Sequence, residues 1–291
     1  MTILLTGASG FVGSHILAHL SAAGHTVLTL GRRADSDCVA DLTDAAAVCG
    51  ALAGAPAFDM VIHCAAAAHT VANDDDYRRV NADGTANLLA ALSARPPRHF
   101  VLISTIAVYG RQEGLDITED APAAATDPYG HSKALAEQMT RQWCTDHDVT
   151  LTVLRLPLVA GPDAPGNLGA MQRGLRKGYY MHIGRADALR SMIHVDDIAP
   201  AVMALYAKGG TYNLVATPVT LRDFADSLTD RKIHTLPLWA VKTAAAVGNI
   251  IPRFPINSAR LSKLTASLTF SSEKLHRATD WRPRPVISKG Q

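Results

Sequence analysis

The chain has 291 residues, of which 48% are hydrophobic and 19% charged, and its formal net charge is +2. This length and apolar content suffice for one large core, or for one core and a smaller lobe. The basic residues are scattered rather than gathered on one face, which argues against a nucleic-acid-binding protein. The four cysteines have neither CxxC nor zinc-type spacing, so we expect a cytoplasmic protein without disulfides or a metal site.

We expect neither a signal peptide nor a membrane partner. The first predicted strand starts at once, with no charged and apolar leader before it. The most apolar window, residues 238–251, contains Lys242 and is too short to cross a bilayer. It is therefore predicted to be a packed helix.

The first segment predicts a strand, a tight turn and a helix. An apolar run meets a glycine-rich turn, which opens directly into an amphipathic stretch. Gly7 would allow the turn, Gly10 would let the backbone approach a pyrophosphate, and Gly13 would let helix and strand pack closely. The N–H groups at the helix start favour phosphate, although a purely structural turn is the alternative. The expected dinucleotide contacts are Gly7, Ser9, Gly10, Phe11, Val12 and Gly13.

The end of the second predicted strand, residues 25–30, bears on the choice of cofactor. An NAD site would place a carboxylate there for the ribose 2′-OH, but the chain has Arg32 and Arg33. Two guanidinium groups favour a 2′-phosphate, so we expect NADP, with NAD as the alternative. Otherwise both arginines are ordinary solvated surface. A short strand then ends at Asp41 and Leu42, where the acid would take the adenine amino group.

Two further buried strands complete the pattern. Residues 60–67 form a near-continuous apolar run, as a central parallel strand should, and we interpret His63 as an interior histidine. A helix is expected over 80–92, and the strand 99–105 ends in two hydroxyl groups. Alternating strands and helices predict an α/β fold of the Rossmann type, a doubly wound parallel sheet with ligand at the carboxyl ends of its strands.

The segment after Asp127 carries the candidate chemistry. Asp127 or Thr126 would cap a helix in which Tyr129 and Lys133 share one face. A tyrosine hydroxyl is a poor base at neutral pH, but a nearby ammonium group favours its phenolate. Thr105 would hold a substrate oxygen while Tyr129 gives or takes its proton. The alternative is an exposed Tyr and Lys that share a helix face by chance.

Together these motifs resemble the extended short-chain dehydrogenase/reductases over almost the whole chain. They are residues 6–13, His63-Cys-Ala-Ala66, Asn81 with Gly84-Thr85, Ser104-Thr105 ahead of Val108-Tyr109-Gly110, and Tyr129-x-x-x-Lys133. The resemblance implies Thr105, Tyr129 and Lys133 as the catalytic set. It also implies further dinucleotide contacts at Asp41, Leu42, Cys64, Ala65, Ala66, Asn81, Ser104, Tyr129, Lys133 and Pro157.

The second half resembles the nucleotide-sugar epimerases within that superfamily. The similar segments are 154–162, 166–168, 190–197 and Trp281-Arg-Pro-Arg-Pro. The resemblance implies that Asn167, Leu168 and Arg190 bind substrate, with Asn167 and Arg190 on the diphosphate, a role that suits a guanidinium fork. The alternative for Arg190 is a surface ion pair with Asp187 or Asp196.

Some positions depart from the epimerase pattern. Leu158 stands where galactose-type epimerases have an asparagine, and a second diphosphate arginine is not obvious, although Arg260, Lys263 and Ser267 are candidates. Ile106 and Ala107 follow Thr105 in place of the acids found in 4,6-dehydratases, so a dehydratase is disfavoured.

We therefore expect a nicotinamide-dependent 4-epimerase or 4-keto reductase of a nucleotide sugar, with a UDP-hexose favoured. The alternatives are a non-catalytic dinucleotide-binding redox sensor and an NADPH-dependent reductase of a non-sugar carbonyl compound. Residues 1–158 and about 192–208 are assigned to the cofactor domain, and residues 159–191 and 209–291 to a smaller substrate lobe. The family resemblance also implies a homodimer.

Overall fold

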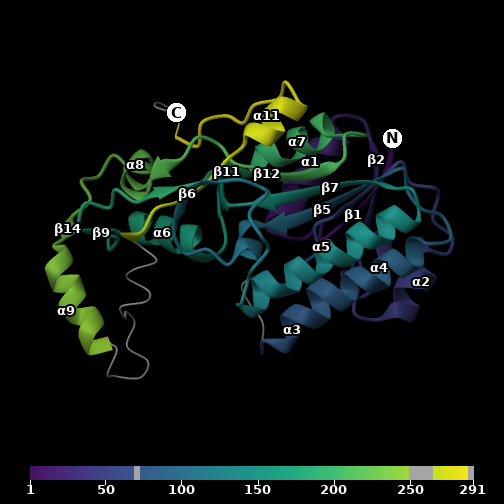
Figure 1. The fold of residues 1–291 in the computed structure, drawn as a ribbon, viewed down its shortest axis with the longest axis horizontal. Helices are drawn as coiled ribbons and strands as arrows, with labels where there is room; N and C mark the ends of the chain where they lie inside the picture. The colour runs from purple at the N-terminus through teal and green to yellow at the C-terminus, as the bar shows by residue number, and fades with distance from the viewer. Residues whose placement is uncertain (69–72, 249–264, 288–291) are drawn as a thin grey trace.

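A seven-stranded parallel sheet forms the centre of the computed structural model, which describes residues 1–68, 73–248 and 265–287 (Figure 1). The strand order is β12-β7-β5-β4-β1-β2-β3. This order reverses between β1 and β4, the kind of switch point at which a doubly wound sheet binds ligand. The strands are β1 (Thr2–Thr6), β2 (Thr26–Gly31), β3 (Cys38–Val39), β4 (Met60–His63), β5 (His99–Thr105), β7 (Thr150–Leu156) and β12 (Gly210–Asn213).

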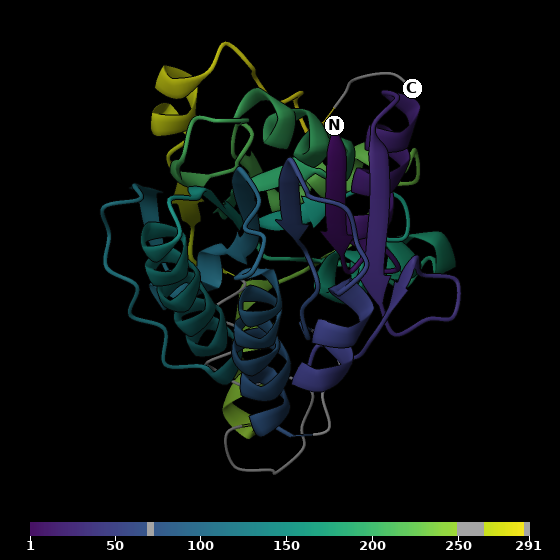
Figure 2. The same cartoon turned by 90° about the vertical axis from the view of Figure 1, so that its right-hand side faces the viewer.

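Helices cover both faces of this sheet, which confirms the predicted α/β fold. Figure 2 shows α2 (Ala45–Leu52), α4 (Gly84–Leu92) and α5 (Pro128–Asp146) side by side on one face. On the other face α1 (Phe11–Ala22) packs against α7 (Ile198–Ala204). Because it is covered on both sides, β4 is buried at every residue, as its continuous apolar run predicts.

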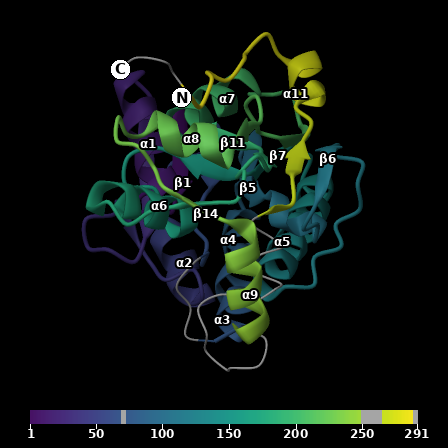
Figure 3. The same cartoon turned by 90° about the vertical axis from the view of Figure 1, so that its left-hand side faces the viewer.

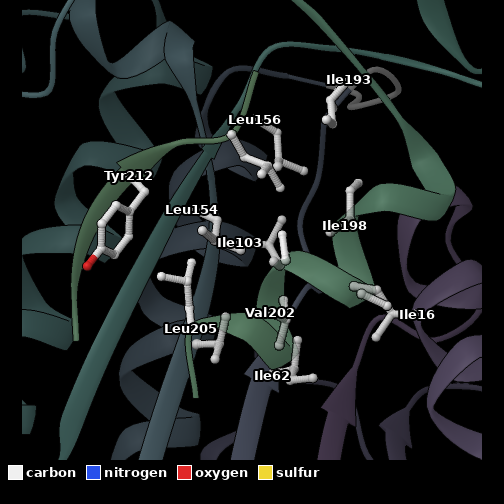
Figure 4. Close-up of a cluster of buried hydrophobic side chains, with 14 of the residues drawn as sticks. Ile16, Ile62, Ile103, Leu154, Leu156, Ile193, Ile198, Val202, Leu205 and Tyr212 are labelled. Carbon is white, nitrogen blue, oxygen red and sulfur yellow. The ribbon is translucent and has the colours of Figure 1, made fainter. Parts of the chain in front are cut away.

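The main core lies between the sheet and the α1–α7 layer. Figure 4 shows Ile16 of α1 and Ile198 and Val202 of α7 facing Ile62 and Ile103 on the sheet. All of these side chains are buried, so the strands that carry the candidate site are fixed by dense apolar packing.

The substrate lobe is built from short strands in three small sheets. The largest has the order β13-β10-β15-β6, while β11 pairs with β8 and β14 with β9. The strands are β6 (Gly114–Ile117), β8 (Leu158–Ala160), β9 (His182–Ile183), β10 (Leu189–Arg190), β11 (Met192–His194), β13 (Val219–Thr220), β14 (Thr235–Leu236) and β15 (Leu268–Phe270). The lobe's helices are α6 (Gly166–Lys177), α8 (Leu221–Ser227), α9 (Leu238–Gly248) and α11 (Glu273–Ala278).

Short helical turns complete the fold. They are α3 (Asp75–Tyr77), the π-helical turn η1 (Arg78–Asp83), η2 (Ile106–Tyr109) and η3 (Val195–Asp197). The helix expected over 80–92 is therefore a π turn followed by α4. Across the described ranges, no helix is both long and apolar enough to cross a membrane.

Three strands fall outside the expected domain division. Two of them, β6 and β11, belong to ranges assigned to the cofactor domain but pair in the small sheets of the lobe. β12 pairs with β7 in the large sheet, although the boundary near residue 208 assigns it to the substrate lobe. Its four residues, Gly210–Asn213, give too short a pattern to reveal which sheet they extend. β11, which opens the range about 192–208, pairs with β8 in a separate two-stranded sheet.

Candidate active site

The turn between β1 and α1 is as tight as its glycines predict. Gly7 has a φ of +75°, and a Cβ there would lie 2.6 Å from the backbone nitrogen of Ala65. A Cβ on Gly13 would lie 2.0 Å from the carbonyl oxygen of Gly7, so only glycine lets α1 start this close to β1. Gly10 caps α1 without a side chain, and the first turn of the helix holds no acid. The N-terminus of α1 thus offers backbone N–H groups to an anion.

A buried chain of hydrogen bonds joins this turn to the end of β4. Thr6 Oγ1 lies 2.7 Å from His63 Nδ1, and His63 Nε2 lies 2.9 Å from Thr85 Oγ1. The Thr85 hydroxyl donates to the carbonyl oxygen of Asn81, so it accepts from Nε2–H of a neutral imidazole. Burial lowers the pKa of His63 to about 3, which keeps the ring neutral. The interpretation of His63 as an interior residue is consistent with its 1% exposure.

Asn81 lies at the junction of three segments. Its Oδ1 accepts from the backbone N–H of Ala67, and its Nδ2 donates to the Ala67 carbonyl and to Ser132 Oγ. Ser132 in turn donates to the carbonyl oxygen of Tyr129. Asn81 is 1% exposed, so its amide holds the loop after β4 against α5. The π turn η1 carries this residue, as such turns often do at functional sites.

The predicted catalytic side chains meet at the carboxyl end of β5. Thr105 ends β5 and Tyr129 lies in the first turn of α5, close enough for the Thr105 side chain to act on the pKa of the Tyr129 phenol. Asp127 caps α5 through the backbone N–H of Gly130 at 2.9 Å, which fixes the helix one turn from Lys133. A Cβ on Gly130 would lie 2.7 Å from the carbonyl oxygen of Ala107, so glycine lets α5 approach η2 closely.

Lys133 is buried in α5, one helical turn after Tyr129. Its Nζ donates to the carbonyl oxygen of Ile103 at 2.7 Å. Burial lowers its pKa to about 8, while Cys64 and Glu137 favour the charged form. Burial raises the pKa of Tyr129 to about 12, against the opposing effect of its hydrogen bond with Thr105. The site therefore holds a protonated phenol at Tyr129 and, one helical turn along α5, an ammonium group that is mostly charged at neutral pH.

A buried ion pair, absent from the sequence predictions, supports Lys133. Glu137 accepts from Arg155 Nε at 3.1 Å and Nη2 at 2.7 Å, and from the Ser104 hydroxyl at 2.5 Å. The side chains of Glu137 and Arg155 are 5% and 7% exposed. Since Glu137 follows Lys133 by four residues, helical spacing was the available signal. The contact with Arg155 of β7 is visible only in the fold.

Tyr77 is a second side chain that the sequence predictions missed. Its ring centroid lies 5.7 Å from that of Tyr129, at an interplanar angle of 58°. It belongs to α3, a short element whose sequence shows no helical period. Tyr77 therefore forms one wall beside the Tyr129 ring.

The remaining predicted cofactor positions line the same edge of the sheet. Cys64, Ala65 and Ala66 directly follow β4, and Pro157 directly follows β7. Burial raises the pKa of the Cys64 thiol to about 11, so it is protonated at neutral pH. Ser104 is buried at the end of β5, where its hydroxyl is directed to Glu137.

The two arginines after β2 lie beside carboxylates. Arg33 binds Asp35 through two nitrogens, at 3.0 and 3.1 Å, and Arg32 lies 3.9 Å from Asp41. Both guanidinium groups are exposed. Hydrogen bonds from Thr43 lower the pKa of Asp41. Leu42 is buried, and its carbonyl oxygen accepts from Asn87 at 2.8 Å.

The predicted substrate residues lie on two elements of the lobe. Asn167 is exposed in the first turn of α6, whereas the side chain of Leu168 is buried in the lobe core. Arg190 is 9% exposed and donates to the carbonyl oxygens of Leu189 and Ala266.

The other acids and candidate phosphate contacts are placed as follows. Asp187 pairs with Arg185, and Asp196 pairs with His15. Ser267 accepts from the backbone N–H of Leu189 at 3.0 Å. The candidates Arg260 and Lys263 lie outside the described residues.

The comparison with protein families is decisive. The NAD dependent epimerase/dehydratase family matches residues 3–214, which include the phosphate turn, Thr105, Tyr129 and Lys133. The chain belongs to this family. The predicted resemblance is confirmed, and the chain is an enzyme of the extended short-chain dehydrogenase/reductase type.

The chain is also similar to individual proteins of this family that are named as 4-epimerases. It is 32% identical over 235 residues to the UDP-glucose 4-epimerase of Azospirillum brasilense, covering 70% of this chain and 68% of the relative. It is 28% identical over 298 residues to N-acetyl-alpha-D-glucosaminyl-diphospho-ditrans,octacis-undecaprenol 4-epimerase of Escherichia coli O157:H7, covering 94% and 88%. The structure of the UDP-glucose 4-epimerase of Thermus thermophilus in complex with NAD matches with a TM-score of 0.77 at 26% identity, covering 98% and 94%.

Proposed function

We propose that this protein is an NAD-dependent 4-epimerase of a hexose carried on a diphosphate. The observation that supports it most directly is that Tyr129 lies close to Thr105, one helical turn before the buried Lys133. Both similar sequences described above are 4-epimerases by name. We favour the epimerase over the keto reductase because an epimerase returns the same hydride and needs no fresh reductant.

The residues fit a nicotinamide dinucleotide at the carboxyl edge of the sheet. Gly7 and Gly13 hold the turn in a shape that any Cβ would obstruct, and the uncapped start of α1 suits the pyrophosphate. The small residues after β4 leave space for a flat ring. Asn81 and Ser104 would act indirectly, since their side chains bind Ala67, Ser132 and Glu137.

Tyr129 and Thr105 would handle the substrate proton. Thr105 would hold the C4 hydroxyl of the sugar while Tyr129 removes its proton, and Tyr129 would return a proton to the same C4 oxygen once the keto sugar has turned its opposite face to the hydride donor. Lys133 stabilises the phenolate of Tyr129 by its charge. A bound nicotinamide supplies reversible hydride transfer with C4. Tyr77, whose ring is tilted against that of Tyr129, would help to keep water from the phenol.

We propose NAD rather than the NADP expected from Arg32 and Arg33. Asp35 already binds Arg33 through two nitrogens, and Asp41 lies beside Arg32, so negative charge surrounds the place where a 2′-phosphate would lie. The 26% identical Thermus thermophilus structure is a complex with NAD. Denaturing the purified protein and identifying the released nucleotide tests this: retained NAD supports the proposal, and NADP contradicts it.

Two substrate classes share the chemistry of a hexose on a diphosphate. A UDP-hexose is favoured by the Azospirillum brasilense relative. A polyprenyl-diphosphate-linked hexose is favoured by the Escherichia coli relative, which aligns with 94% of this chain. Leu158, where galactose-type epimerases have an asparagine, packs against the lobe core. Arg190 and Asn167 would contact the diphosphate common to both substrates.

Replacing Tyr129 by phenylalanine tests the enzyme. We expect 4-epimerisation to fall about 10²- to 10⁴-fold while dinucleotide remains bound, because only the acid/base hydroxyl is lost. Tyr179→Phe, a change at an exposed position of the lobe, is the matched control and should retain full activity. Unchanged turnover in Tyr129→Phe would contradict the role of Tyr129, whereas dinucleotide binding without any turnover in the unmodified protein would favour the non-catalytic redox sensor. The expected homodimer stays a prediction, to be checked by the mass in solution.

A further inference from the structure

The end of the substrate lobe carries exposed apolar side chains. Of the eight large hydrophobic residues that are exposed in the described part of the chain, five fall within residues 179–239. Four of them define what we call the end face: Tyr179, Met181, Leu236 and Trp239. Trp239, at 73% exposure, is the most exposed of all.

These four residues are brought together by β9, β14 and α9. Leu236 of β14 pairs with Ile183 of β9, two residues after Met181. Leu238 and Val241 of α9 pack on Ile183, which leaves Trp239, Lys242 and Thr243 exposed on the helix. Figures 1 and 3 show α9 standing off from the body of the molecule at the lobe end. The exposed side of α9 thus combines an indole and an ammonium group three residues apart.

Basic side chains surround the end face. Lys232 lies just before β14, and Lys177 ends α6 two residues before Tyr179; both are exposed. Beside them, Arg176 and Arg231 line a groove of about 500 Å³ whose apolar residues are Leu175 and Leu228. Asp163 also lines the groove, 3.8 Å from Arg176. Three further acids lie near the end face: exposed Asp230 directly precedes Arg231, Asp187 pairs with Arg185, and Asp226 is bound to His182 at 3.0 Å.

The sequence shows the same charge division on a larger scale. Residues 159–291 contain 18 Lys and Arg against 9 Asp and Glu, whereas residues 1–158 contain 10 against 17. An anionic surface would attract the lobe and repel the cofactor domain. This asymmetry orients the whole molecule with the end face toward negative charge.

We propose that the end face binds the surface of an anionic phospholipid bilayer. Tryptophan and lysine on one helix face are the side chains that anchor interfacial helices, and clustered basic residues are attracted to anionic headgroups. A second copy of this chain fits less well, because two basic end faces would repel each other. The proposal rests on the second substrate class above: a polyprenyl carrier stays in the bilayer, so the enzyme must come to the membrane surface.

The strands of the large sheet point their carboxyl ends toward the lobe (Figure 1). Docking through the end face therefore places the lobe, rather than the cofactor domain, next to the headgroups. The sugar diphosphate of a membrane-held substrate enters from the lobe side, where Arg190 and Asn167 lie.

The test is flotation of the full-length protein with vesicles of phosphatidylcholine alone, or with about one-third phosphatidylglycerol. We expect binding to the anionic vesicles, weak binding to the neutral ones, and release by high salt. The double substitution Trp239→Ser with Lys242→Glu should lower binding about tenfold or more. The matched control, Val39→Ser with Arg98→Glu on the cofactor domain, should bind like the unmodified protein.

Equal flotation of the two double variants, or no flotation with anionic vesicles, would overturn the proposal. A lipid-independent change of mass in solution caused by Trp239→Ser would overturn it too, since a second copy would then cover the end face. Flotation needs no turnover, so it stays informative if the epimerase proposal fails. Turnover of a water-soluble UDP-hexose should be the same in both double variants, which separates membrane binding from catalysis.

Discussion

The carboxyl edge of the large sheet and the substrate lobe hold their functional side chains in different ways. At the edge, Lys133, Glu137 and Asn81 are almost fully buried and joined by short hydrogen bonds across β5, β7 and η1. In the lobe, Asn167 and Trp239 are exposed on helices attached to strands of two or three residues. The chemistry that we propose thus lies on a rigid layer, and the recognition that we propose lies on a peripheral one. Substitutions at the edge should affect folding and catalysis, and substitutions in the lobe should affect binding alone.

The largest effect is expected for Gly13→Ala. The added Cβ would lie 2.0 Å from the Gly7 carbonyl oxygen, so α1 must move away from β1. We expect dinucleotide affinity to fall about 100-fold or more, because the N–H groups of the turn lose their alignment. Gly50→Ala in α2, where nothing lies within 4 Å of the new Cβ, should instead stabilise the fold by about 0.5–1 kcal/mol. Titration with NAD measures the affinity of each variant, and urea unfolding measures its stability. Normal NAD binding by Gly13→Ala would contradict the assignment of this turn to the dinucleotide.

The next effect is expected for Glu137→Gln, which leaves Arg155 buried without its carboxylate. Removing one partner of such a pair costs about 3–5 kcal/mol of unfolding free energy. It should also lower the pKa of Lys133 further below about 8, because Glu137 favours the ammonium form. The alkaline fall in epimerase rate, which follows loss of that charge, should then move to lower pH.

A double variant separates these two consequences. Glu137→Gln combined with Arg155→Gln leaves no unpaired charge at this position. Much of the lost free energy of unfolding should therefore return, while the alkaline fall in epimerase rate should stay at the lower pH. The pH–rate profile and urea midpoint are compared with those of Glu273→Gln, an exposed pair with Arg277, where both should stay unchanged. If the profile of the double variant matches that of the unmodified enzyme, Glu137 does not tune Lys133.

Acid should weaken the edge through His63. Its pKa is lowered from 6.5 to about 3 in the fold by burial, so the unfolded chain binds more protons between these values. The stability that the fold has with a neutral His63 is complete above about pH 6.5 and is lost as the pH falls toward 3. At about pH 4.5 the free energy of unfolding should be lower by about 3 kcal/mol. Urea unfolding at about pH 7 and about pH 4.5 should show a smaller acid loss in His63→Gln than in the exposed control His19→Gln. An equal loss in both variants would show that His63 is not buried neutral.

The smallest effect is expected in the lobe, for Asn167→Ala. This exposed side chain would lose one hydrogen bond to the substrate diphosphate, worth about 0.5–1.5 kcal/mol, so KM should rise about 2- to 10-fold. The kcat and the urea midpoint should not change. Lys177→Ala, at the other end of α6, is the control. A fall in kcat comparable to that of edge variants would remove the distinction between the two regions.

The sequence by itself determined the cofactor layer. Apolar runs at residues 60–63 and 99–105, glycines at 7 and 13, and the four-residue spacing of Tyr129 and Lys133 are local patterns whose period fixes strand, turn and helix face. A strand that is buried on both faces is apolar along most of its length, so its limits can be recognised from the sequence. The observed strand β5 has the predicted bounds.

Only the tertiary structure decided what lies far apart in the chain but close in space. The Glu137–Arg155 pair, the Tyr77–Tyr129 contact and the place of β12 beside β7 each depend on strand order, which no local period encodes. The exposed pairs Arg33–Asp35 and Arg32–Asp41 join residues that are near in the chain, but only the fold of their loop shows the contacts that support our proposal of NAD. Charge neutralisation and desolvation act through space, and a sequence pattern records only distance along the chain.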